Sequence, residues 1–466
     1  MRDTLRSRVL YRTLVTLAAV LAGLPAPAEE AAVLPAAPPA LDPRIYSIAG
    51  AASAERVEKD IRTLVGFGTR HTLSETESDN RGIGAARRWI HAEFERISAA
   101  CDGCLEVSFQ RSVVKAGESP RIPEDTEIVS VLAVLRGTHE PGRYMIMSGD
   151  IDSRVSDIFD ATSDSPGAND NASGMAGTLE AARVLTRYRF GASIVFAGLS
   201  GEEQGLFGGR EMARVATDED WRIDAVLNND MIGNIQGVDG VIENSTFRVF
   251  SEPTPVTETD EQRRIRRFTG GEVDGPSRQL ARYVDRITDL YFTNIDAIMI
   301  YRLDRFGRGG HHRPFNDAGF PGVRIMETHE NYTRQHQDLR VENGIRYGDV
   351  LEGVDFDYAA RLTGINATTL AALAWAPPAP GNARIRGAVQ PSTTLRWDPV
   401  ASPSLAGYKI YWRATTAPQW THSRWVGPAT EHTLEGMVID NFLFGVTSVG
   451  KDGNESVVAF PAPDRR

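Results

Sequence analysis

The chain has few cysteines, no excess of positive charge and few long apolar runs. Its 466 residues include only two cysteines, which excludes a disulfide-rich scaffold and a four-cysteine zinc site. Lysine and arginine (51) are fewer than aspartate and glutamate (62), and no basic stripe is present, so nucleic-acid binding is not expected. Beyond the first 28 residues, no run approaches the length of about 20 apolar residues that spans a bilayer.

The first 28 residues have the features of a secretory signal. Four arginines precede an apolar stretch at 13–24, and an Ala-Pro-Ala cleavage site lies at 26–28. We therefore expect export to the periplasm or the extracellular space, with no integral membrane segment after signal removal. A single membrane anchor is the alternative, although the stretch is short for one. In an oxidising compartment, Cys101 and Cys104 are expected to form a structural disulfide.

Composition and periodicity divide the remaining chain into three parts. Residues 29–45 are rich in alanine and proline, which predicts a disordered linker. In residues 46–375 helical and strand patterns alternate, and hydrophobic runs such as 127–135 indicate strands buried on both faces. This pattern predicts an α/β fold with a mostly parallel central sheet flanked by helices. Short strands and turns from 376 to 466 predict a small all-β sandwich domain.

The periodicity also gives approximate element positions. Helices are predicted at 54–67, 82–101, 174–188 and 277–291, and strands at 106–114, 127–135, 144–148, 193–198, 225–228 and 322–327. The polar segment 251–275 is expected to be a surface excursion.

Acidic residues directly follow three of the predicted strands. They are Asp150 and Asp152 after 144–148, Glu202 and Glu203 after 193–198, and Asp230 after 225–228. A further acid, Asp170, lies in a turn that opens a helix. Ligands of open α/β sheets bind at the carboxyl ends of the strands, where gathered carboxylates repel one another unless cations neutralise them.

Each of these residues has a simpler interpretation when taken alone. Asp170 suits a helix N-cap, the Glu202–Glu203 pair suits a solvated surface, and Asp230 suits a turn. Their joint occurrence in this order favours a divalent-metal site.

The motifs GANDNASG (167–174), SGEEQG (200–205) and NNDMIG (228–233) resemble those of the secreted co-catalytic zinc aminopeptidases. That family also contains glutaminyl cyclases, and the resemblance spans roughly residues 50–370. It implies that Asp170 bridges two zinc ions, that Glu203 binds one of them, and that Asp230 binds the other. It also implies that Glu202 is the general base, a role typically worth about 10²–10⁴ in rate.

The chain departs from the family pattern at its first metal ligand. The family usually has His-x-Asp where this chain has Asp150-Ile151-Asp152, so the first metal loses an imidazole. Asp152 matches the residue that supports that histidine. With the three carboxylates of Asp150, Asp170 and Asp230 as ligands, the first site would favour a harder ion such as Mn²⁺ or Mg²⁺. Alternatively the first site is empty, and the chain holds a single zinc ion.

The remaining zinc ligand is expected to be a late histidine. The family's Tyr-His-x-x-x-Asp pattern is blurred here, since His336 lies two residues before Asp338. We favour His336 as the ligand, with His329 as the alternative and no histidine ligand as the third option.

A second departure lies in the segment 310–315, where the family commonly shows Asp-His-x-Pro-Phe. His312 keeps the position that normally lines the substrate cleft, whereas His311 replaces an aspartate that organises the site. For His311 we expect a surface or supporting position, with contact to the first metal as the alternative. Arg305 and Arg308 are expected to border the substrate pocket.

Together these features predict an exported metal-dependent exopeptidase that acts on peptides, most simply an aminopeptidase. One alternative is glutaminyl cyclisation or hydrolysis of another amide on the same scaffold. A second is a non-catalytic binding protein with a degenerate site, against which the retention of both Glu202 and Glu203 argues. Residues 376–466 resemble a fibronectin type III module, expected to make surface contacts and no catalysis.

Overall fold

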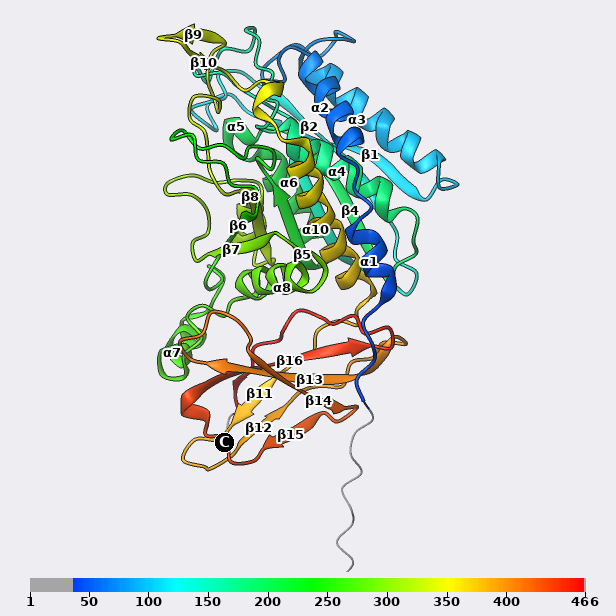
Figure 1. Cartoon of the computed structure of the whole chain (residues 1–466), viewed down its shortest axis with the longest axis vertical. Coiled ribbons are helices and arrows are strands. Elements are labelled where there is room, and N and C mark those ends of the chain that lie inside the picture. The colour runs from blue at the N-terminus through cyan, green and yellow to red at the C-terminus, as the bar shows by residue number, and fades with distance from the viewer. Residues whose placement is uncertain (1–36, 465–466) are drawn as a thin grey trace, which may run out of the picture. The chain divides into compact units, whose positions relative to one another are not determined.

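An eight-stranded mixed sheet is the centre of the larger part of the molecule (Figure 1). The computed structural model describes residues 37–464. The strands of this sheet are β1 (Leu105–Val114), β2 (Thr126–Leu135), β3 (Glu140–Asp150), β4 (Ala192–Leu199), β5 (Arg222–Asn229), β6 (Thr246–Ser251), β7 (Asp296–Ile300) and β8 (Gly322–Glu327). Their order across the sheet is β1-β2-β4-β3-β5-β8-β6-β7.

The inner strands of the sheet run parallel. β3 pairs in parallel with both β4 and β5, and β5 pairs in parallel with β8. Antiparallel pairing occurs toward the edges, between β1 and β2, β2 and β4, and β6 and β8. This confirms the α/β class with a mostly parallel centre.

Helices cover both faces of the sheet. The helices of the described residues are α1 (Pro43–Ala49), α2 (Ala54–Gly66), α3 (Gly82–Ala99), α4 (Ala172–Leu185), α5 (Glu202–Gly205), α6 (Phe207–Asp218), α7 (Asp260–Thr269), α8 (Pro276–Tyr291), α9 (His312–Asp317) and α10 (Phe356–Trp375), of which α7 buries no residue. One hydrophobic core packs helices α1, α2, α3, α4, α8 and α10 against one face of the sheet. A second core packs α6 and α9 against the opposite face. In the residues that the structure describes, no helix is both long and apolar enough to span a bilayer.

Strand β4 shows why these sequences form buried strands. Its successive side chains alternate between the two cores, since Ile194 and Phe196 pack in the first and Val195 and Ala197 pack in the second. A strand covered on both faces needs apolar residues at every position. The continuous hydrophobic run in the sequence follows from this.

The structure corrects the predicted end of the disordered linker. Residues 29–36 lie outside the described part of the chain, but Pro43–Ala49 forms α1, so the expectation is wrong for residues 43–45. The side chain of Asp42 accepts the backbone N–H of Arg44, and Pro43 takes the first turn, where its missing N–H costs no hydrogen bond. Ile45 is fully buried in the main core, which holds the helix in place.

The predicted disulfide is confirmed. Cys101 and Cys104 are bonded between the end of α3 and the start of β1. The predicted signal at 1–28 lies outside the described residues.

Residues after α10 form two small sheets. Their strands are β11 (Arg384–Arg386), β12 (Thr393–Arg396), β13 (Leu405–Ala414), β14 (His422–Gly427), β15 (Glu431–Leu434), β16 (Phe442–Gly450) and β17 (Ala462–Pro463), with a 3₁₀ turn η2 (Ile439–Asn441). The sheet orders are β15-β12-β11-β17 and β14-β13-β16. Leu395 of the first and Ile410 of the second belong to one buried core, so the two sheets pack face to face.

A small hairpin and a short turn complete the chain before α10. They are β9 (Arg340–Glu342), β10 (Ile345–Tyr347) and the 3₁₀ turn η1 (Leu351–Gly353).

Candidate metal centre

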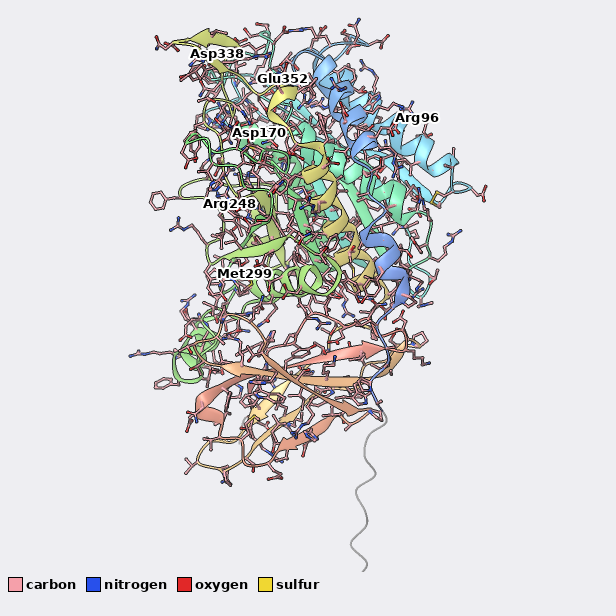
Figure 2. The ribbon with its side chains drawn as sticks, in the orientation of Figure 1. Arg96, Asp170, Arg248, Met299, Asp338 and Glu352 are labelled. Atoms are coloured by element: carbon pink, nitrogen blue, oxygen red, sulfur yellow. A yellow bond between two sulfur atoms is a disulfide. The ribbon has the colours of Figure 1, made fainter. Side chains whose placement is uncertain are left out.

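The candidate residues lie at one edge of the sheet, where four neighbouring parallel strands end. Asp150 is the last residue of β3, α5 begins with Glu202 three residues after β4, and Asp230 directly follows β5. Close packing brings the start of α4 to the same edge, because a Cβ on Gly149 would collide with the backbone of Gly174. Figure 2 labels Asp170, which lies in the loop before α4 at this end of the sheet.

Three predicted ligands meet at one point. Among residues 37–464, the one group of acidic and histidine side chains placed to hold a metal ion is Asp170, Glu203 and His336, with ligand atoms within 4.8 Å of one another. His336 Nε2 lies 2.9 Å from Asp170 Oδ2 and 2.9 Å from Glu203 Oε1. These three residues, the metal triad, match the number of protein ligands in a catalytic zinc site, which leaves one position open. His336 belongs to this group and His329 does not.

The electrostatics of the triad also suit a cation. Burial alone would lower the pKa of His336, but the carboxylates of Glu203 and Asp170 outweigh it and raise that pKa to about 9. The two carboxylates therefore favour positive charge at this point, and a divalent ion would supply more of it than a proton does.

Residues that the sequence analysis missed hold the triad in place. Asp349 accepts the backbone N–H of Asp170 at 2.6 Å and that of Asn169 at 2.9 Å. Arg154 donates to Glu203 Oε2 at 2.8 Å, and its guanidinium lies 2.6 Å from His336 Nδ1. Asp349 and Arg154 both lie in loops, which have no hydrophobic periodicity. For Arg154, its position directly after the Asp150–Ser153 segment was the available sequence signal.

Glu202 lies beside the triad with its carboxylate unengaged. The side chain is partly exposed and makes no hydrogen bond within the described part of the chain, although its neighbour Glu203 is buried and engaged. Burial raises the pKa of Glu202 well above its ordinary value, and the negative charge of Glu203 adds to the shift. A carboxylate with a raised pKa is a stronger proton acceptor than an ordinary glutamate.

Asp152 contacts the backbone of α5 rather than a histidine. Its two oxygens accept the backbone N–H of Glu202 at 3.1 Å and of Glu203 at 3.0 Å. Thr72 donates its hydroxyl to the same carboxylate at 2.8 Å. Asp152 therefore fixes both glutamates at the turn that follows β4.

Asp150 is not brought into the metal triad. Its Oδ2 accepts the side-chain amide of Asn171 at 2.8 Å, and its Oδ1 shares a hydrogen bond of 2.6 Å with His311 Nδ1. Burial raises the pKa of Asp150 well above its ordinary value, and the charge of Asp152 acts in the same direction. Both oxygens are thus engaged by protein groups.

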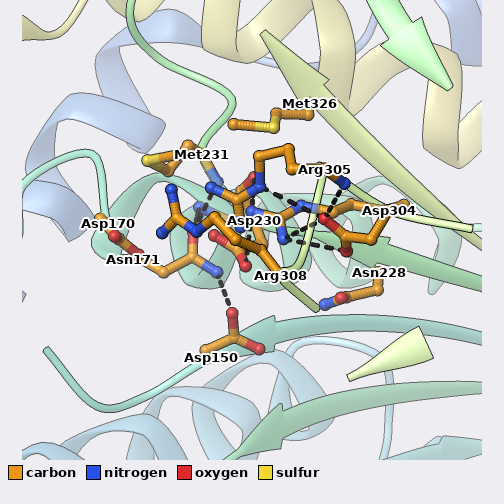
Figure 3. Close-up of polar contacts among 12 residues, drawn as sticks. Asp150, Asp170, Asn171, Asn228, Asp230, Met231, Asp304, Arg305, Arg308 and Met326 are labelled. Atoms are coloured by element: carbon orange, nitrogen blue, oxygen red, sulfur yellow. Dashed lines mark hydrogen bonds and ion pairs between the residues drawn. The ribbon is translucent and has the colours of Figure 1, made fainter. Parts of the chain in front are cut away.

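Asp230 also lies outside the triad and contacts arginine. Arg324 Nη2 lies 2.7 Å from Asp230 Oδ2, and both side chains are buried. Burial raises the pKa of Asp230, and the guanidinium of Arg324 opposes that shift. Figure 3 shows Asp230 together with Arg305 and Arg308, and Asp150 with its hydrogen bond to Asn171.

The remaining candidates support this region from different sides. His311 is fully buried, as is His312, whose Nε2–H donates to the carbonyl of Leu303 at 2.8 Å. Neither is at a surface, so the surface position considered for His311 is wrong and its supporting role at Asp150 is the observed one. Arg308 is one-third exposed and lies 3.4 Å from Glu330 and 3.3 Å from Gln335.

Arg324 was missed although the sequence carries a signal for it. It stands alone among apolar neighbours in the middle of β8, a strand in which every residue is buried. A charge that is fully buried needs a partner, so an arginine at such a position predicts a buried acid nearby.

Comparison with known proteins gives consistent matches. The model of Peptidase family M28 matches residues 130–343. A protein of Leptosphaeria maculans named a probable zinc metalloprotease is 42% identical over 426 residues, which cover 91% of this chain and 98% of that protein. A protein of the same name from Pyrenophora tritici-repentis is 38% identical over 425 residues, covering 91% of this chain and 98% of that protein.

A solved structure shares the fold. The LapA aminopeptidase of Legionella pneumophila has a TM-score of 0.50 to this chain at 17% identity, covering 71% of this chain and 72% of that one. At this identity the match concerns architecture alone.

Proposed function

Because this chain belongs to peptidase family M28, we propose that it is an exported zinc-dependent aminopeptidase. The observation that carries the proposal is the metal triad of Asp170, Glu203 and His336 with the unengaged Glu202 beside it. Relatives at about 40% identity that are named zinc metalloproteases support zinc as the ion. The choice of an aminopeptidase rests on the resemblance of the three acidic motifs to secreted zinc aminopeptidases.

In the proposed peptide hydrolysis, different residues of this chain have different roles. Asp170, Glu203 and His336 would hold a zinc ion, which would supply Lewis acidity toward a peptide carbonyl and toward water. Glu202 is placed to take a proton from the attacking water and to deliver it to the departing amine. Asp152 fixes the backbone of Glu202 and Glu203, so that the carboxylate of Glu203 lies in the triad and that of Glu202 stays free.

The proposal is tested with chromogenic aminoacyl anilides. The purified chain is stripped of metal by a chelator, reloaded with zinc, and assayed on leucine p-nitroanilide and on its N-acetylated form. We expect the zinc-loaded protein to hydrolyse the free-amine substrate and to spare the acetylated one, and the stripped protein to do neither.

Three other outcomes would contradict the proposal, each in its own way. Equal hydrolysis of the acetylated substrate would make the protein a general amidase or endopeptidase. Ammonia release from an N-terminal glutaminyl peptide, without anilide hydrolysis, would favour a glutaminyl cyclase. Failure of the chain to bind zinc would favour a non-catalytic binding protein.

Export and the C-terminal module belong to the same proposal. The Cys101–Cys104 disulfide supports an oxidising compartment, and the two packed sheets after residue 376 support a fibronectin type III-like module. Sequencing the amino end of protein recovered from the medium or periplasm tests export, with a start at residue 29 expected. Recovery of the chain only in the cytoplasm with residue 1 retained would contradict it.

A further inference from the structure

The sequence motifs allow a second cation between Asp150, Asp170 and Asp230, but the structure supplies that region with a cation of its own. Arg324 enters from the middle of β8 and is fully buried. Its Nη2 lies 2.7 Å from Asp230 Oδ2 and donates to the Asp230 carbonyl at 3.2 Å. The guanidinium therefore contacts the acid that a second metal would need.

The other end of the same guanidinium is also tied down. Arg324 Nη1 donates to the carbonyl of Gly309 at 2.8 Å and lies 3.2 Å from Asp304 Oδ2. The guanidinium of Arg324 is planar, buried and bonded at both ends. We therefore treat it as a fixed part of the site.

The second predicted ligand has no oxygen to spare. Asp150 gives one oxygen to Asn171 and the other to His311 Nδ1. Among the three predicted ligands, the oxygens left are Asp230 Oδ1, which is buried without a hydrogen-bond partner, and Asp170 Oδ1, since the contacts of Asp170 with His336 and Gln335 use Oδ2. Two carboxylate oxygens are fewer than the three or four ligands that a stable site needs.

The surrounding charges also disfavour a dication. Arg305 is buried between Asp304 at 3.3 Å and Glu330 at 3.0 Å, and Arg308 reaches the same glutamate. A metal bound to Asp230 would face these guanidinium groups at short range in a medium of low dielectric constant. The region between Asp150 and Asp230 is thus neutralised by protein groups and does not fit a second ion.

We propose that Arg324 replaces the second metal of a two-metal centre, and that the protein works with a single ion held by Asp170, Glu203 and His336. The inference rests on the proposed function, because it takes that triad to be the zinc site. Asp230 then serves as the partner of a buried arginine and not as a metal ligand. One consequence is that Asp170 would contribute to one metal ion and would not bridge two.

Metal counting tests the inference without relying on activity. The full chain is equilibrated with excess zinc, freed of loosely bound ions by gel filtration, and analysed by plasma mass spectrometry. The same is done with manganese, the harder ion that an all-carboxylate site would prefer. Asp230→Asn and Asp170→Asn are matched variants, since each exchanges one carboxylate for an amide of equal size.

We expect the wild type and Asp230→Asn to retain a single zinc ion per chain, and Asp170→Asn to lose it, with no additional manganese in any of them. Two ions in the wild type, falling to one in Asp230→Asn, would overturn the inference and leave the proposed function standing. No ion in the wild type would overturn both. The wild-type count decides the matter even if one variant folds poorly.

Discussion

The carboxylate of Asp152 accepts the backbone N–H of Glu203 at 3.0 Å, and so joins the loop after β3 to the turn after β4. Its other oxygen accepts the neighbouring Glu202 N–H at 3.1 Å. One buried acid thus positions both the proposed base and a proposed zinc ligand. Asp152 is not close enough to the triad to be part of it, since the metal-holding group consists of Asp170, Glu203 and His336.

The first prediction concerns this acid. Asp152→Asn keeps the size of the side chain but leaves one acceptor oxygen for two N–H groups. We expect zinc affinity or kcat/KM to fall about 10–100-fold, the usual cost of losing a residue that orients a ligand. Thr72→Val is the matched control, because it removes only the hydroxyl that donates to Asp152 at 2.8 Å. Wild-type zinc affinity and kcat/KM in Asp152→Asn would contradict the role.

The second prediction separates the two adjacent glutamates. Glu202→Gln should lower kcat/KM by about 10²–10⁴, the usual contribution of a general base, and should keep its zinc. Glu203→Gln should lose the zinc, because Glu203 Oε1 belongs to the triad. Anilide hydrolysis and metal content, measured on both variants, check this. If Glu202→Gln hydrolyses the anilide at the wild-type rate, the general base lies elsewhere.

The pKa of Glu202 sets a related expectation for the wild type. Burial and the charge of Glu203 raise this pKa well above its ordinary value. A base acts only in its ionised form, so kcat/KM should rise with pH through the raised pKa.

The third prediction concerns protons that compete with zinc at His336. The carboxylates of Glu203 and Asp170 overcome the effect of burial and raise the pKa of His336 in the metal-free protein to about 9. Zinc binds only the neutral imidazole, so each unit of pH below 9 should weaken zinc binding about tenfold. Competition with a chelator of known affinity between pH 6 and 9 measures the slope. A zinc affinity independent of pH would show that His336 binds no proton that zinc must displace.

Much of the fold could be predicted from the sequence, and the exceptions have physical causes. Strand β8 has the predicted bounds, 322–327, because the apolar residues Val323, Ile325 and Met326 mark a buried strand even with Arg324 among them. Helix α10 was not predicted, because nearly all of its residues are buried among other helices and it shows no amphipathic stripe. Helix α7 lies in the predicted surface excursion and buries none of its residues, so its polar sequence carried no helical pattern of apolar residues.

The site was predictable where ligands sit in local motifs and not where a remote element contributes. Asp170, Glu202 and Glu203 each stand next to glycines or strand ends that fix them locally. The contact between Arg324 and Asp230 joins residues 94 apart and depends on β5 and β8 being neighbours, which the strand order alone reveals. Periodicity within one segment cannot report such a pairing.

The last prediction concerns Glu455, which joins the C-terminal sheets to α8. This buried carboxylate lies 2.9 Å from Arg286 of α8, accepts the hydroxyl of Tyr411 at 2.7 Å, and pairs with Lys409. Burial would raise the pKa of Glu455, but the two cations outweigh it and lower that pKa from 4.5 to about 2. The ion pairs of Glu455 with Arg286 and Lys409 therefore stabilise the folded chain above pH 4.5, and that stability is lost as pH falls toward 2.

A shift of this size corresponds to about 3 kcal/mol at neutral pH, at about 1.4 kcal/mol per pKa unit. Glu455→Gln should therefore melt below the wild type at pH 7, because it leaves the partly buried Arg286 without its counter-charge. The gap should close between pH 4 and pH 2, where the wild-type carboxylate is itself protonated. Melting curves across this range check the sign, and Glu431→Gln is the control, since that exposed residue lies 3.4 Å from Arg386. A melting difference that stays constant with pH would mean that Glu455 acts through packing rather than through its charge.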